Sequence, residues 1–268
     1  LRVTQSHIDL QKHPLLWRMD QSSNFDMSAY ASDTYSPWST GRQRATQMGA
    51  AGDHPSIGPL PLWEARALQS GDHRAWAATE ASALAALSYN INYRDSATGL
   101  VPTFASIGTK ALASGTWPSQ TNGSDAAMWE TAHAPDVGLM AFIGRPSPVF
   151  IEIAQKAATW NGAWSNDNTP GWSAGLFGYW YQIRGRAWGL RSVAHAAFIT
   201  PSGLPWRASG ITAITNNVNH LTQWTANANH NLNAITDYTP TAPRDFGGTA
   251  GFQNSLWQHH YLTVVLHR

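Results

Sequence analysis

Residues 129–136 combine the side chains that acid–base chemistry uses. The segment holds an indole, two carboxyl groups and an imidazole, on Trp129, Glu130, Asp136 and His133. Carboxylates and imidazoles exchange protons with reacting groups, and loops on a rigid scaffold often carry them. We therefore treat Glu130, His133 and Asp136 as candidate catalytic residues. In the structural alternative, Asp136 caps the next helix, Glu130 is solvated and His133 donates to a loop carbonyl.

A second segment gathers aromatic rings and guanidinium groups. Its chemistry-bearing residues are Tyr181, Arg184, Arg186 and Trp188, followed on the same predicted helix by Arg191 and His195. β-Elimination on a uronic acid requires a cation to neutralise the carboxylate, a base for the α-proton and an acid for the leaving oxygen. Arg186, His133 and Tyr181 could fill these roles in that order. The alternative is an aromatic–arginine stack that joins two helix hairpins, braced by Arg191.

Several rings and polar groups are candidates for binding a sugar. We predict substrate contacts from His54, Trp129, Arg184, Trp188 and Trp206. His54 precedes Pro55 much as His133 precedes Pro135, so both imidazoles are expected at the same rim. Trp206, like Trp117, Trp164 and Trp172, lies among small polar residues, as a stacking platform for a pyranose requires. The alternatives are a satisfied loop histidine and ordinary core packing of the indoles.

Hydrolysis is the competing chemistry, and it requires two carboxyl groups roughly 5–10 Å apart across the scissile bond. The candidates are Glu64, Glu130, Asp136, Asp237 and Asp245. No two of them are paired by their spacing in sequence. We predict no metal site, because the adjacent His259 and His260 point to different sides of a helix and the chain has no cysteine. No cofactor is expected.

The composition narrows the class of partner. The chain has 268 residues, 17 basic and 16 acidic, for a net charge of +1, so no overall field attracts nucleic acid. It contains no apolar run of membrane-spanning length. Only 12% of the residues are charged while 14 are Trp, a profile typical of exported proteins that handle neutral or weakly charged glycans. We expect a secreted or periplasmic protein whose partner is a polysaccharide or oligosaccharide.

The elements that must position these residues are predicted to be helix hairpins. Residues 1–50 lack a helical period and are expected to form an irregular segment that packs on the rest. Residues 51–268 are predicted to form one helical domain. The expected helices span 58–70, a helix capped by Asp72, 135–143, about 150–162, 186–199, 211–221 and 252–266. The last helix has no return partner, so either the array stops unpaired or the natural chain is longer, with flanking domains or a homo-oligomer as further possibilities.

Two hairpins share a signature at their entry. The sequences Pro55-Ser56-Ile57-Gly58 and Pro135-Asp136-Val137-Gly138 both read Pro-x-(Ile/Val)-Gly. Proline suits the first turn of a helix, and glycine permits close helix packing. The third hairpin keeps only a Gly-Leu step at 189–190. The repetition predicts a mainly α fold made of about three to four hairpins.

On these residues the chain resembles the (α/α) toroids of six-hairpin glycosidases and toroid polysaccharide lyases. The resemblance is carried by hairpins joined by long polar loops and by segments 129–133 and 184–191 at helix starts, and it covers roughly residues 50–268. It implies a complete or incomplete toroid whose loops surround a cleft with stacking Trp residues. The chain departs from the pattern in having about seven helices, fewer than a closed six-hairpin ring needs. No single family matches, so no catalytic residue is transferred.

The sequence thus predicts a polysaccharide-active enzyme, with a lyase acting on a uronic-acid-containing glycan favoured over a glycoside hydrolase. The concentration of His133, Tyr181 and Arg186 at two hairpin mouths supports this hypothesis. The alternative is a non-catalytic glycan-binding or assembly module, which the scarcity of carboxylates favours. A structural subunit with an aromatic protein interface is a third hypothesis.

Overall fold

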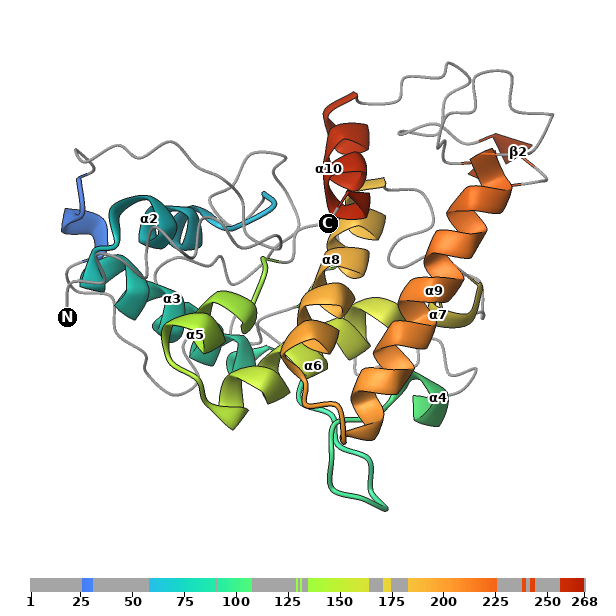
Figure 1. The fold of residues 1–268 in the computed structure, drawn as a ribbon, viewed down its shortest axis with the longest axis horizontal. Coiled ribbons are helices and arrows are strands. Elements are labelled where there is room, and N and C mark those ends of the chain that lie inside the picture. The colour runs from blue at the N-terminus through green and yellow to red at the C-terminus, as the bar shows by residue number, and fades with distance from the viewer. Residues whose placement is uncertain are drawn as a thin grey trace, which may run out of the picture.

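The computed structural model shows a mainly helical protein, which confirms the predicted class (Figure 1). It describes residues 26–30, 58–89, 91–107, 129, 131, 135–163, 171–174, 183–225, 238–239, 242–243 and 256–267. Within these ranges the β structure is one antiparallel pair of two-residue strands, β1 (Tyr238–Thr239) and β2 (Ala242–Pro243). No helix in the described ranges is long and apolar enough to cross a membrane. Closure of the hairpins into a toroid stays a prediction.

The first hairpin consists of α2 (Leu62–Ser70) and α3 (His73–Ala85), which pack against each other. The turn between them confirms the predicted helix end at residue 70 and the predicted Asp72 cap. Gly71 takes the left-handed conformation at φ 63° and its N–H donates to Ala67 O, while the Asp72 carboxylate accepts from Arg74 N at 2.8 Å. Helix α2 begins at Leu62, later than the predicted residue 58, because Pro59 and Pro61 keep their preceding residues out of the helical region.

The second hairpin consists of α5 (Leu139–Gly144) and α6 (Pro148–Ala163). Helix α5 starts at Leu139 rather than at Pro135, because Gly138 has φ 97° and so lies outside the helical region. A Cβ atom on Gly138 would lie 2.6 Å from Phe150 O and 2.7 Å from Ala154 Cβ. The glycine therefore allows the close approach of α5 to α6 that the entry signature predicts.

The third hairpin places helix α8 in the middle of the described structure. Helices α8 (Ile183–Ile199) and α9 (Pro205–Thr225) pack side by side, and α8 also packs against α6 and α10 (Leu256–Leu266). The last helix, predicted to lack a return partner, packs on α8: the Trp188 and Tyr261 ring centroids lie 4.6 Å apart, and Leu262 is buried beside them.

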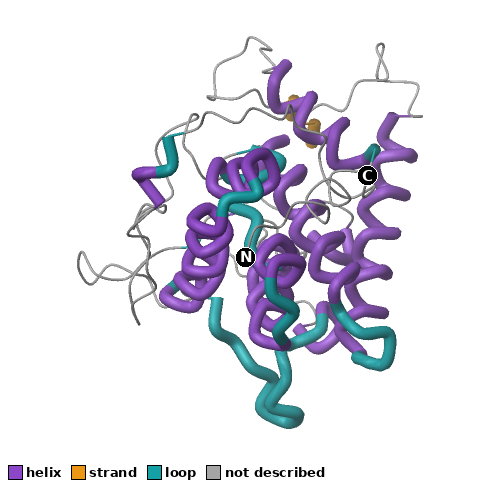
Figure 2. The backbone as a smooth tube through the Cα atoms, turned by 60° about the vertical axis from the view of Figure 1, so that its left-hand side comes forward, coloured by secondary structure: helices purple, strands orange, loops and turns teal. Residues whose placement is uncertain are grey.

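Short helices complete the described fold. They are η1 (Ser28–Tyr30), η2 (Ala86–Ser88), α4 (Phe104–Ile107) and α7 (Gly171–Ala174). From the N-terminal segment, Met27 and Tyr30 enter the main hydrophobic core together with Trp63 and Leu190. The loop between α3 and α4 and the α8–α9 turn lie at the same end of the array, as Figures 1 and 2 show.

Candidate functional site

Helix α8 carries polar and aromatic residues along its length. They lie at two levels along the helix axis, and each level contacts a different part of the chain. Arg184 and Arg186 lie in its first turn, Arg191 near its middle and His195 in its second half. All four side chains are buried. Since a helix rises about 1.5 Å per residue, Arg186 and His195 lie about 13 Å apart along the axis.

At the first level, α8 and α9 bring a guanidinium and an imidazole together. Arg186 is buried and His220 of α9 is half-buried. Burial is the main cause that lowers the pKa of His220, and the positive charge of Arg186 lowers it further. A lowered pKa favours the neutral form of the His220 imidazole, which is the form that can accept a proton.

Trp188 follows Arg186 in this helix and is completely buried. The Arg191 guanidinium carbon lies 4.3 Å from the Trp188 ring centroid, and the Tyr261 ring packs against the same indole. These contacts match the predicted alternative of an aromatic–arginine stack braced by Arg191. A sugar platform needs an open ring face, which Trp188 does not offer in this structure.

At the second level, α8 holds both hairpin entry segments. Arg191 donates to Gly58 O at 2.6 Å and contacts Pro59 O at 3.4 Å. One helical turn later, Nδ1 of His195 lies 2.9 Å from Oδ2 of Asp136. Gly58 and Asp136 belong to the two copies of the Pro-x-(Ile/Val)-Gly signature. The signature therefore marks two segments that dock side by side on one helix.

Asp136 does not cap α5, so the capping alternative is wrong. Gly138 precedes α5 without a side-chain cap, and the Asp136 carboxylate is 1% exposed. Burial alone would raise the pKa of Asp136, but His195, Arg191 and the backbone N–H of Val137 outweigh burial and lower this pKa. Because His195 and Arg191 hold this carboxylate inside the protein, the geometry favours an anchoring role, and a catalytic role stays a prediction.

The other sugar-binding candidates in the described residues are also enclosed. Trp129 is buried, donates from Nε1 to Asn161 Oδ1 at 3.0 Å and meets the Tyr89 ring edge-on. Trp206 donates from Nε1 to Thr159 Oγ1 at 2.9 Å, and its ring lines a cavity of about 500 Å³. Arg184 is 5% exposed. Of the predicted Trp platforms, Trp206 is the one that borders the described cavity.

The remaining predicted catalytic and binding residues lie outside the described ranges. They are His54, Glu130, His133, Tyr181, Asp237, Asp245, Trp117 and Trp164. Among the hydrolytic candidates that are described, Glu64 and Asp136 are both buried in the core. No group of three or more metal-binding side chains occurs within the described ranges.

The structure adds two histidines to the candidates. The sequence analysis placed His195 on the right helix without a role and predicted a helix over 211–221 without singling out His220. In the same helix, Asn216 donates to Trp172 O at 3.1 Å and Asn217 to Ala213 O at 2.8 Å, so both side chains serve packing. Arg186 and His220 lie nearly equally far in sequence from the α8–α9 turn, and an antiparallel hairpin brings such residues together.

Comparison with known proteins gives no assignment. No family model, no curated protein and no solved structure matches this chain.

Proposed function

We propose that the chain degrades a uronic-acid-containing polysaccharide by β-elimination, with Arg186 and His220 at the reacting centre. The observation that carries this proposal is a half-buried imidazole, with a pKa lowered by burial and by the charge of Arg186, together with that buried guanidinium where α8 begins. In a poorly hydrated site, a fixed cation interacts strongly with a carboxylate. We also expect the protein to act outside the cytoplasm, where such polymers occur.

The reaction assigns one task to each group. Arg186 neutralises the substrate carboxylate, which makes the proton on the adjacent carbon more acidic. His220 accepts that proton from the carbon. The released electron pair forms the new carbon–carbon double bond as the bond to the leaving glycosidic oxygen breaks, and Tyr181 donates a proton to that oxygen. His133 is the other candidate for the base.

Hydrolysis has weaker support. It requires two carboxyl groups that flank a glycosidic bond, whereas Glu64 and Asp136 both interact with the buried Arg191 guanidinium. The Asp136 carboxylate is moreover engaged by His195 at 2.9 Å. A β-elimination needs a cation and a base instead, which are the groups that α8 and α9 supply.

The test is to incubate the protein with uronate polymers and with neutral polysaccharides, following ultraviolet absorbance of unsaturated ends and release of reducing ends. We expect both signals on a uronate polymer, and loss of both in Arg186→Gln and His220→Asn. The exposed residues Arg145 and His73 supply matched controls, Arg145→Gln and His73→Asn, which should retain activity. Reducing ends without the chromophore, or neither signal on any uronate polymer, would overturn the proposal.

A pH titration tests whether Arg186 acts on His220. Since Arg186 lowers the pKa of His220, the Arg186→Gln variant should raise the His220 pKa, which an NMR titration of the imidazole measures without substrate. In the active wild type, the acid limb of kcat/KM should lie below the ordinary histidine pKa of about 6.5. An unchanged imidazole titration in Arg186→Gln would show that the guanidinium does not act on His220.

A further inference from the structure

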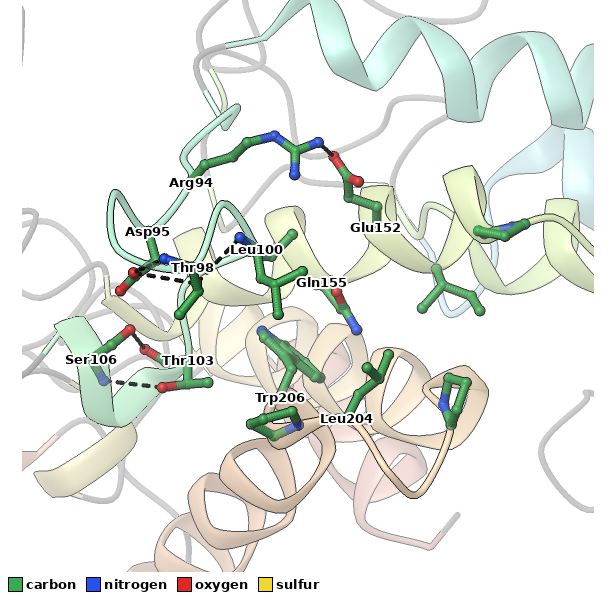
Figure 3. Close-up of a pocket in the computed structure, with 15 residues that line it drawn as sticks. Arg94, Asp95, Thr98, Leu100, Thr103, Ser106, Glu152, Gln155, Leu204 and Trp206 are labelled. Carbon is green, nitrogen blue, oxygen red and sulfur yellow. Dashed lines mark hydrogen bonds and ion pairs between the residues drawn. The ribbon is translucent and has the colours of Figure 1, made fainter.

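A cavity of about 500 Å³ opens at the end of the array that holds the α8–α9 turn (Figure 3). Its walls come from three parts of the chain: the segment 94–106, the first half of α6 and the turn that leads into α9. Binding sites for small molecules range from about 300 to 1,000 Å³. The volume therefore suits a small-molecule ligand.

The walls of this cavity are mostly apolar. In Figure 3, Leu100, Leu204 and Trp206 lie around the same space, and the other apolar lining residues are Val101, Ile151 and three prolines. The backbone around the cavity is tied together by Thr159, whose hydroxyl donates to Pro102 O at 3.1 Å and accepts from Trp206 Nε1. Apolar walls held in this way favour a ligand that buries hydrocarbon or aromatic surface.

The charged groups at the cavity already have ion-pair or hydrogen-bond partners within the protein. Glu152 binds Arg94 and also lies 2.8 Å from Lys156 Nζ. Asp95 accepts from the backbone N–H groups of Ala97 and Thr98 at 2.9 and 3.0 Å. A charged ligand would have to compete with these contacts, whereas a neutral one would leave them intact.

One buried polar side chain is directed at this space. Gln155 is 7% exposed, and its amide nitrogen donates to Thr200 Oγ1 at 2.9 Å. Within the described ranges no group donates to Gln155 Oε1. A side-chain carbonyl oxygen at an apolar wall is an acceptor that a single ligand N–H or O–H would satisfy.

We propose that this cavity binds a neutral, mainly apolar molecule with one hydrogen-bond donor, such as an aromatic amine or a phenol. The donor meets Gln155 Oε1 and the apolar body packs against Trp206 and Leu204. Helix α8 separates this site from Arg186 by about 20 Å along its axis. The site is therefore distinct from the one that carries the proposed elimination, and the two proposals stand independently.

The first experiment titrates the full chain with N-phenyl-1-naphthylamine, a neutral aromatic amine that fluoresces in apolar surroundings. We expect saturable binding, weakened about tenfold or more in Leu204→Glu, because a carboxylate in the apolar wall must be desolvated. Leu204 is 39% exposed, so the variant should fold, which circular dichroism checks. The matched control is Ile211→Glu, at a position on α9 that is 49% exposed and does not line the cavity.

A second experiment tests Gln155. N-methyl-N-phenyl-1-naphthylamine lacks the N–H, so the wild type should bind it about two- to tenfold more weakly than the parent amine, the range of one net hydrogen bond. The Gln155→Met variant should not distinguish the two probes. No binding of the parent probe, equal binding by Leu204→Glu and wild type, or displacement of the probe by an oligosaccharide would each overturn the proposal. The last outcome would make the cavity a sugar subsite.

Discussion

The Arg191 side chain is almost completely buried, with 3% exposure. Burial lowers its pKa, while the nearby carboxylates of Asp136 and Glu64 oppose this shift. Its donors bind Gly58 O and Pro59 O, and its planar face covers Trp188. Removing one partner from a buried set of charges leaves the other charges without compensation.

We therefore expect Arg191→Met to lower the free energy of unfolding by about 3–5 kcal/mol in urea titrations. Arg191→Lys should cost less, because it keeps the charge but loses the planar fork that spans the carbonyls and the ring. Arg145, which is 61% exposed, supplies the comparison: Arg145→Met should cost about 0–1 kcal/mol. Equal losses in the two methionine variants would show that the Arg191 contacts do not stabilise the fold.

The Asp72 carboxylate, which caps α3, makes the stability of the fold depend on pH. Its hydrogen bonds from Arg74 lower its pKa to about 2, from an ordinary value of 3.8. A lowered folded-state pKa stabilises the protein above the unfolded value, and this contribution is lost as the pH falls from about 4 towards 2. Asp72→Ala should cost about 1 kcal/mol at pH 7 and less at pH 2.

Asp72→Asn separates the two effects in the same titrations, because asparagine caps a helix without carrying a charge. It should retain most of the stability at pH 7 and show a shallower loss between pH 4 and pH 2 than the wild type. If the wild type and Asp72→Asn lose stability in parallel over that range, the carboxylate of Asp72 is not the titrating group.

At the scale of elements, local sequence rules predicted some helix ends and missed others. Gly71 and Asp72 mark the α2–α3 turn because their conformational and capping preferences act within a few residues. The predicted start of α5 is four residues early, since Pro135 suits a first turn but the contact that fixes Gly138 comes from α6. Helix starts that depend on a neighbouring helix cannot be read from the segment alone.

Gly138 also yields a prediction for the α5–α6 hairpin. Any side chain there must adopt φ 97° and place its Cβ against Phe150 O and Ala154. Gly138→Ala should therefore cost about 2–5 kcal/mol, combining backbone strain with overpacking. Gly203→Ala is the control, because its Cβ would meet nothing within 4 Å and the change should stay within about 0.5 kcal/mol. Thermal unfolding of both variants tests the prediction, and equal midpoints would contradict it.

At the scale of the whole molecule, the sequence predicted hairpins but not which helix joins them. Arg191 and Gly58 lie 133 residues apart, and His195 and Asp136 lie 59 apart. Spacing within a helix indicates which residues share a face, yet it carries no information about the partner of that face. The shared Pro-x-(Ile/Val)-Gly signature was the available hint, because two similar segments can dock on the same element. The central position of α8 emerges only from the packed structure.

The arrangement along α8 leads to a prediction about the two proposed sites. Arg186 and Leu204 lie near opposite ends of α8. The distance between them exceeds the roughly 7–10 Å within which the effects of two substitutions usually couple. Arg186→Gln should abolish elimination and leave the affinity for N-phenyl-1-naphthylamine within about twofold of wild type. Leu204→Glu should weaken binding of the probe and leave kcat/KM for elimination within about twofold of wild type. The double variant should show both losses without an additional one. A Leu204→Glu protein that folds normally but loses elimination would instead make the cavity part of the polysaccharide site, because a rigid helix alone would not transmit the change.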